Sequence, residues 1–188
     1  MLSVDLVLGD SFGGGTGNKS VTAFENVAAG SWEVDQVVLR GDGGSNRLNV
    51  AYANHGAIFG GRGDDKLAGH YFADLLVGGD GNDLLAGGGN DDRLYGGRGL
   101  DTATFSRNAS SGDYVEASLL TGLAYFYSGS TTQGIARIRD IENLEGAPGD
   151  DSLIGNGRDN SLAGLGGNDS CWVIEATINF WGRAEPIV

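Results

Sequence analysis

Aspartates recur at a fixed spacing in the middle of this 188-residue chain, and carboxylates held at regular intervals can bind cations. Residues 60–104 divide into five consecutive units of nine residues, and the sixth place of every unit is an aspartate. These aspartates are Asp65, Asp74, Asp83, Asp92 and Asp101. The eighth place is leucine in four units and Ala103 in the fifth. Five matches in phase indicate a structural repeat rather than a Gly-rich linker.

Each unit predicts a six-residue turn followed by a three-residue strand. Glycine in the turn permits positive φ angles, and the apolar middle residue of the strand would face inward. Two units would then form one flat coil. If coils stack at the strand spacing of about 4.8 Å, the eighth-place residues form an internal ladder and the aspartates line two edges. Turns on the same edge are two units apart.

This arrangement requires a cation. Carboxylates about 5 Å apart repel by about 1 kcal/mol in bulk water and by several times that at a protein surface. The available ligands are carboxylate oxygens and the carbonyls of Gly-rich turns. Such oxygen-only sites favour a hard ion with irregular coordination, so Ca2+ fits better than Mg2+.

The units GGRGDDKLA (60–68) and GGDGNDLLA (78–86) resemble the GGxGxDxUx nonapeptide of the RTX (repeats-in-toxin) family. The resemblance implies an all-β fold, a parallel β-roll (β-helix) solenoid. It also implies export in unfolded form through a type I system, followed by Ca2+-driven folding outside the cell. We therefore expect two calcium-binding arrays with strand-rich flanks.

The best sites are predicted between Asp65 and Asp83 and between Asp83 and Asp101, because those turns keep the family's glycines. The expected metal-binding residues are Gly60, Gly61, Gly63 and Asp65, Gly78, Gly79, Gly81 and Asp83, and Gly96, Gly97, Gly99 and Asp101. The opposite edge pairs Asp74 with Asp92. The bulky residues His70, Tyr71 and Phe72 in the turn before Asp74 predict a site that is empty or distorted.

A second array at 146–172 places Asp151 and Asp169 on either side of Asn160, and we expect one ion between the two aspartates. Its eighth places run through Leu144, Leu153, Leu162 and Cys171, which predicts that Cys171 is buried. Asp35 has no same-edge partner in phase, so no site is expected there.

The full division of the chain follows from these patterns. We expect an N-terminal strand flank (1–29), degenerate repeat coils (30–59), the main array (60–104), a strand and hairpin flank (105–145), the second array (146–172) and a capping tail (173–188). The hairpin is expected around Thr121 and Gly122. An export signal is the alternative for the tail. Leu75, Val77 and Tyr95 should form an outward patch that the 105–145 flank covers, with a partner or a polysaccharide as the alternative cover.

A net charge of −13 argues against nucleic acid and anionic membranes as partners. The single cysteine permits no internal disulfide. No segment is long and apolar enough for membrane insertion, and the N-terminus lacks a signal-peptide pattern.

Catalytic motifs are weak. Residues 9–13 fit GxSxG, but the glycines that follow allow no helix, and the phosphate-loop-like run at 13–20 has Asn18 where glycine is needed. We therefore expect a secreted, extracellular, non-catalytic module with calcium ions as partners, and with a polysaccharide or cell surface as a further possible partner. The alternatives are the C-terminal repeat part of an extracellular enzyme (a serralysin-like protease, a lipase or an alginate epimerase) and a calcium-dependent adhesin or surface-layer component.

Overall fold

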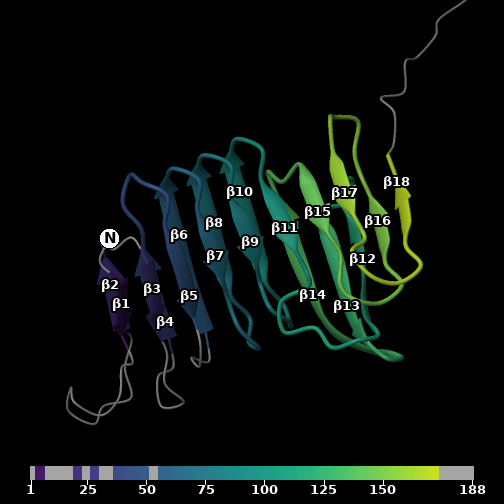
Figure 1. Ribbon diagram of the computed structural model, residues 1–188, viewed down its shortest axis with the longest axis horizontal. Helices are drawn as coiled ribbons and strands as arrows, with labels where there is room; N and C mark the ends of the chain where they lie inside the picture. The colour runs from purple at the N-terminus through teal and green to yellow at the C-terminus, as the bar shows by residue number, and fades with distance from the viewer. Residues whose placement is uncertain (1–2, 7–18, 23–25, 30–35, 51–54, 174–188) are drawn as a thin grey trace, which may run out of the picture.

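The chain folds into a β-roll, in which two mainly parallel sheets face each other (Figure 1). The computed structural model describes residues 3–6, 19–22, 26–29, 36–50 and 55–173. These residues contain no helix, and so none that is long and apolar enough to cross a membrane. Asp35, the residue 9–13 motif, most of the 13–20 run and all but the first residue of the tail lie outside the described residues.

Among the described residues, the first sheet, sheet A, has eight strands, all paired in parallel. In spatial order they are β1 (Ser3–Leu6), β3 (Asn26–Ala29), β5 (Arg47–Val50), β7 (Lys66–Ala68), β9 (Leu84–Ala86), β11 (Thr102–Thr104), β15 (Asn143–Glu145) and β17 (Ser161–Ala163).

The second sheet, sheet B, has ten strands within the part of the chain that the structure describes. In spatial order they are β18 (Ser170–Trp172), β16 (Ser152–Ile154), β12 (Asp113–Ser118), β13 (Leu123–Ser128), β14 (Thr131–Arg139), β10 (Arg93–Arg98), β8 (Leu75–Asp80), β6 (His55–Arg62), β4 (Gln36–Arg40) and β2 (Lys19–Thr22). The chain alternates between the sheets through both arrays. Each unit of nine residues supplies one strand, and successive units supply it to sheet A and sheet B in turn.

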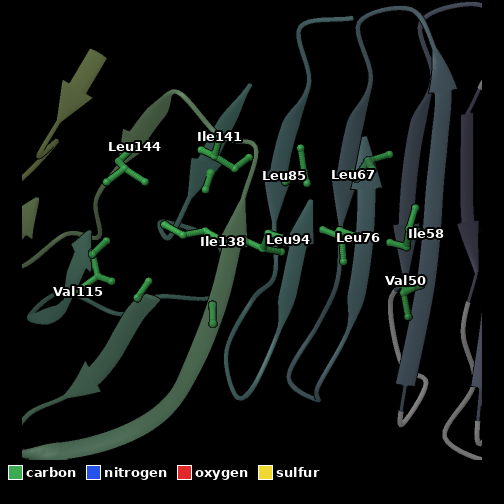
Figure 2. Packing of buried hydrophobic residues seen from close by; sticks show 14 of the residues in the cluster. Val50, Ile58, Leu67, Leu76, Leu85, Leu94, Val115, Ile138, Ile141 and Leu144 are labelled. Atoms are coloured by element: carbon green, nitrogen blue, oxygen red, sulfur yellow. The ribbon is translucent and has the colours of Figure 1, made fainter. Parts of the chain in front are cut away.

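The eighth-place residues form the predicted internal ladder. Leu67 and Leu85 lie in register in sheet A, and Leu76 and Leu94 lie in register in sheet B. All four are at most 1% exposed. Figure 2 shows them on facing strands, pointing into the space between the sheets. Burial of these side chains, worth about 1.5–3 kcal/mol each, holds the short strands together.

The segment between the arrays supplies three strands to sheet B, β12, β13 and β14, which is two more than a regular coil of the roll would supply. β12 and β13 pair antiparallel around Gly122 (φ 70°), which confirms the predicted hairpin. β13 also pairs antiparallel with β14, whereas in sheet A β11 pairs directly with β15. The inward residues of the added strands include two pairs in register, Ala117 with Ala124 and Val115 with Phe126. The added strands widen sheet B by about 10 Å relative to sheet A.

Two packing expectations are corrected. Cys171 is exposed because its strand, β18, is the last of sheet B and has a described neighbour on one side only. β14 of the flank does not stack over Leu75, Val77 and Tyr95, which are half-buried, because it joins sheet B edge to edge beside β10 and extends that face. Arg107 of the flank lies against sheet A instead, donating from Nε to the Gly69 carbonyl at 2.9 Å.

Candidate metal centre

The turns between the sheets form two edges, each lined by sixth-place side chains. Edge one contains the turns that lead from sheet B into sheet A, and edge two contains the turns that lead back. Edge one carries Asn46, Asp65, Asp83, Asp101, Glu142 and Asn160, each immediately before a strand of sheet A. Edge two carries Asp74, Asp92, Asp151 and Asp169, each immediately before a strand of sheet B. The sequence-predicted pairs therefore share an edge.

The carboxylates of edge one are linked by backbone hydrogen bonds from coil to coil. The N–H of Asp65 donates to Oδ1 of Asp83 at 2.8 Å, and the N–H of Asp83 donates to Oδ1 of Asp101 at 2.8 Å. The N–H of Asn46 donates to Oδ1 of Asp65 at 2.7 Å. Each of these aspartates thus uses one oxygen to fix the preceding coil, and the spacing of the carboxylates along the edge is set by the strand stacking.

The second oxygen of each of these carboxylates is buried without a hydrogen-bond partner. These atoms are Oδ2 of Asp65, Asp83 and Asp101. The three side chains belong to residues that are at most 2% exposed. A buried polar atom without a partner is rare and requires an explanation, because its desolvation is not compensated. Three such oxygens at equivalent positions indicate a common missing ligand.

A second-place glycine with a positive φ angle distinguishes these turns from the turns before Asp74 and Asp151, and the turn before Asp92 shares this feature, since Gly88 has a φ of 105°. Gly61, Gly79 and Gly97 hold the second place with φ between 117° and 123°. A Cβ added to Gly79 would lie 2.1 Å from the carbonyl oxygen of Gly61, and one added to Gly97 would lie 2.2 Å from that of Gly79. Only glycine fits these positions, because both the φ angle and the close approach of successive coils exclude a side chain. We call these turns open.

In other turns the second-place N–H caps the sixth-place side chain. At Asp74, the N–H of His70 donates to Oδ2 at 2.7 Å and the N–H of Gly56 donates to Oδ1 at 2.5 Å. Both oxygens are therefore satisfied by the protein, and we call this turn closed. Asp92 accepts the N–H of Asp74 at 2.9 Å. Edge two of the main array therefore differs from edge one at the turn that contains His70, Tyr71 and Phe72, and an empty or distorted site there stays a prediction.

The second array contains two closed turns, before Asp151 and Asn160, and one open turn, before Asp169; at Asn160 the N–H of Asn156 donates to Oδ1 at 2.7 Å. Asp151 accepts N–H donors on both oxygens, from Val115 at 2.7 Å and from Ala147 at 2.7 Å. The N–H of Asp151 in turn donates to Oδ1 of Asp169 at 3.0 Å. Leu165, at the second place of the Asp169 turn, has a φ of 75°. The two aspartates are on one edge, as the spacing predicts, but only Asp169 has an oxygen left for a further ligand.

Burial raises the pKa values of the edge carboxylates. The pKa of Asp65 and of Asp101 rises to about 6, first because of desolvation and then because of neighbouring carboxylates, with backbone hydrogen bonds opposing the rise. The same cause raises the pKa of Asp83. At edge two, burial raises the pKa of Asp92 to about 8. Near neutral pH these groups are ionised only at a cost, and a bound cation would offset that cost.

The donor set of edge one fits a calcium ion. Within the part of the chain that the structure describes, no three acidic, histidine or cysteine side chains converge on one point. A site between two turns therefore combines two carboxylates with backbone carbonyls of the glycine-rich turns. All of these ligands are oxygens, which suit Ca2+ and its tolerance of irregular coordination.

Glu142 is an edge-one residue that sequence reasoning missed as a site residue. The N–H of Asp101 donates to its Oε2 at 3.0 Å, across 41 positions of sequence. The signal was present in the phase of the second array, since Glu142 lies nine residues before Asp151 and two before Leu144. It was not recognised because the residues before it do not form a glycine-rich turn.

Comparison with known families agrees with this geometry. A family model described as the RTX calcium-binding nonapeptide repeat matches the chain in four copies, over residues 57–70, 69–103 and 142–172. The matched segments contain both arrays and begin the second one at Glu142. No curated protein matches the chain.

Proposed function

We propose that this chain, an RTX-type repeat protein, is a secreted and non-catalytic module whose folding depends on calcium bound outside the cell. The observation that carries the proposal is the set of three buried carboxylate oxygens without partners on edge one. They occur where the turns are open, and the Asp74 and Asp151 carboxylates in closed turns have no such atom.

The ligands we assign are those of the three open turns. Asp65, Asp83 and Asp101 supply the carboxylates, and the glycines at places one, two and four of each turn supply carbonyls. These turns form two ion positions, one between Asp65 and Asp83 and one between Asp83 and Asp101, so Asp83 in the middle turn belongs to both. Bound Ca2+ would supply positive charge between carboxylates that otherwise repel one another.

The energies favour ion-dependent folding. Extracellular calcium sites have dissociation constants of about 10⁻⁴–10⁻³ M. At ten times that concentration each ion stabilises the fold by about 1.4 kcal/mol. Several ions together approach the whole stability of a small domain, about 5–15 kcal/mol. A chain of this kind would stay unfolded at the low calcium level of a cytosol and fold at millimolar calcium.

Far-ultraviolet circular dichroism tests the proposal. The chain is prepared in metal-free buffer and titrated with CaCl2, with MgCl2 at the same ionic strength as the control. We expect a β-sheet signal to appear with Ca2+ at submillimolar to millimolar concentrations and not with Mg2+. A spectrum that is already folded in metal-free buffer and does not change with Ca2+ would refute the calcium-dependent folding.

One surface favours a second candidate function, the binding of an acidic polysaccharide. On the outer face of sheet B, Arg93 and Arg137 are neighbours in register, as are Tyr95 and Arg139. Neither Arg93 nor Arg137 has an ion pair with any described residue. Like charges on adjacent strands destabilise a sheet, and they stand out in a chain with a net charge of −13. A polyanion would relieve this repulsion.

The shape of this surface also suits an extended ligand. A groove of about 840 Å³ is lined by Tyr95, Arg137, Arg139 and Arg158, and also by the acidic residues Asp140 and Glu142, of which Asp140 pairs with Arg139 at 3.8 Å. An aromatic ring beside several arginines can stack on a sugar and pair with its carboxylates. This face thus supports the adhesin alternative more directly than it supports a catalytic one.

Binding of short oligogalacturonates by the calcium-loaded protein, measured by calorimetry, tests this second candidate. Neutral oligosaccharides of the same length serve as the ligand control. We expect R93Q and R137Q to weaken binding several-fold, whereas R62Q, at a residue whose side chain is 82% exposed outside the groove, leaves it unchanged. Equal binding of charged and neutral sugars would eliminate the candidate.

A further inference from the structure

We propose that Glu142 is a calcium ligand together with Asp101, so that an ion at the end of the first array also fixes the second array. The inference rests on the calcium-binding function proposed above. It adds a third inter-turn position to edge one, formed by residues that are far apart in the sequence.

The first argument is the stacking of Glu142 on Asp101. The N–H of Asp101 donates to Oε2 of Glu142 at 3.0 Å, as the N–H of Asp83 donates to Oδ1 of Asp101 at 2.8 Å. In return, the N–H groups of Glu142 and Asn143 donate to the carbonyl of Asp101 at 3.1 and 2.9 Å. Glu142 therefore occupies the place of the next aspartate in the ladder, with the strands after it in register.

The second argument is that oxygen atoms available as ligands lie close to Asp101 and Glu142. Oδ2 of Asp101 is buried without a hydrogen-bond partner, and the residue is 0% exposed. The carbonyl of Asp140 accepts the N–H of Gly97 at 3.3 Å, so it continues the line of carbonyls along the edge. Asp140 has a φ of 52°, a conformation that glycine usually adopts.

A purely structural role for Glu142 explains less. Glutamine at this position would accept the N–H of Asp101 equally well and would add no charge. The glutamate instead places a second negative charge beside a buried carboxylate. The Glu142 carboxylate accepts the N–H of Asp101, whose own Oδ2 is buried without a hydrogen-bond partner. A cation between Asp101 and Glu142 makes this arrangement favourable.

The position of Glu142 gives the ion a role in connecting the two arrays. After Thr104 the chain leaves the stacked turns of edge one to form the segment between the arrays, and it returns to edge one at Glu142. Asn160 of the second array then donates from Nδ2 to the carbonyl of Glu142 at 2.9 Å. A ligand pair of Asp101 and Glu142 would therefore close the insertion and couple the second array to calcium bound by the first.

The test compares E142Q with E145Q in the full chain. Glutamine keeps an oxygen acceptor for the N–H of Asp101, so E142Q should fold in saturating calcium. Glu145 lies three residues away at the end of β15, and its replacement removes the same charge outside the ladder. Native mass spectrometry counts the bound ions, and calorimetry measures their affinities.

We expect E142Q to bind one ion fewer than the wild type, or to bind one ion at least tenfold more weakly, and E145Q to match the wild type. Equal stoichiometry and affinity in E142Q would overturn the inference while leaving the proposed function intact. A wild type that binds no calcium would overturn both.

Hydrogen exchange of the wild type gives a second measurement that requires no variant. Protection of residues 139–145 should appear at the same calcium concentration as protection of residues 96–104. Protection of 139–145 that does not depend on calcium would contradict the role of Glu142.

Discussion

Replacement of Asp65 by asparagine should have opposite effects on the calcium-free and calcium-loaded protein. Asparagine keeps an oxygen that can accept the N–H of Asn46, a bond of 2.7 Å in the wild type, and it removes a buried charge whose Oδ2 has no partner. The pKa of Asp65 is raised from 3.8 to about 6. At 1.36 kcal/mol per pH unit, ionised Asp65 destabilises the calcium-free fold at neutral pH by up to about 3 kcal/mol. D65N removes this penalty.

D74N is the matched control. Burial raises the pKa of Asp74 to about 6 as well, so its replacement relieves a similar penalty. However, Asp74 accepts N–H donors on both oxygens, from Gly56 and from His70. Asparagine can accept only one of them, and loss of a buried acceptor costs about 1–3 kcal/mol. The two effects nearly cancel, so D74N should change the calcium-free stability little.

The assay is folding in metal-free buffer driven by trimethylamine oxide, which favours compact states, followed by circular dichroism. D65N should fold at a clearly lower osmolyte concentration than the wild type, and D74N should not. With calcium at ten times its dissociation constant, D65N should lose the stabilisation of at least one ion, about 1.4 kcal/mol. If D65N and D74N respond alike to calcium, or if D65N binds as the wild type does, the assignment of edge one is wrong.

Three further predictions concern the ladder and the core. In metal-free buffer the fold should be more stable at pH 5 than at pH 8. Carboxylates with raised pKa values, up to about 8 for Asp92, contribute stability that is present at low pH and is lost as the pH rises through those values. Thermal melts should show this order of stability, and calcium should reduce the difference. G79A should unfold the main array, or make its folding require much more calcium, since the added Cβ would lie 2.1 Å from a carbonyl oxygen. G89A is the control, because Gly89 has a similar φ of 133° but no atom within 4 Å of the added Cβ, so this variant should lose only about 1–3 kcal/mol of stability to backbone strain. L76A should destabilise the calcium-loaded protein by about 2–5 kcal/mol in urea melts, and L120A, at a residue 61% exposed, should be near neutral.

The nine-residue phase was sufficient to predict the roll. The period fixes which residues face inward, so Leu67, Leu76, Leu85 and Leu94 and the two aspartate edges could be located before any coordinates. The hairpin around Thr121 and Gly122 was predicted from the turn residues and from the alternation of apolar and polar residues on either side. The sequence did not reveal that β12 and β13 would enter sheet B between the arrays, because a hairpin signal identifies two strands that pair but not the sheet that receives them.

The quality of individual turns was harder to predict. The turn before Asp151 has the expected acidic residue, yet its second-place N–H, from Ala147, donates to the carboxylate and closes the turn. Whether a turn is open or closed depends on the φ angle of its second-place residue, and the number of glycines in the turn predicts that angle only in part. Leu165 shows the reverse case, since it takes a positive φ without being glycine. Glu142 was missed because its contact with Asp101 depends on where the insertion rejoins the roll.

The hydrogen bonds that the sixth-place carboxylates of edge one accept all run in one direction along the roll. In each step from Asn46 to Asp101, the earlier coil donates its N–H and the later coil accepts with its carboxylate. A coil added at the N-terminal end of a growing stack thus finds its acceptor in place and leaves a free carboxylate, which a cation can satisfy. A coil added at the C-terminal end leaves a free N–H, which a cation cannot satisfy. The ladder of carboxylate hydrogen bonds is therefore polar, and under the proposed function a bound cation would favour its growth from the C-terminal coils toward the N-terminal ones.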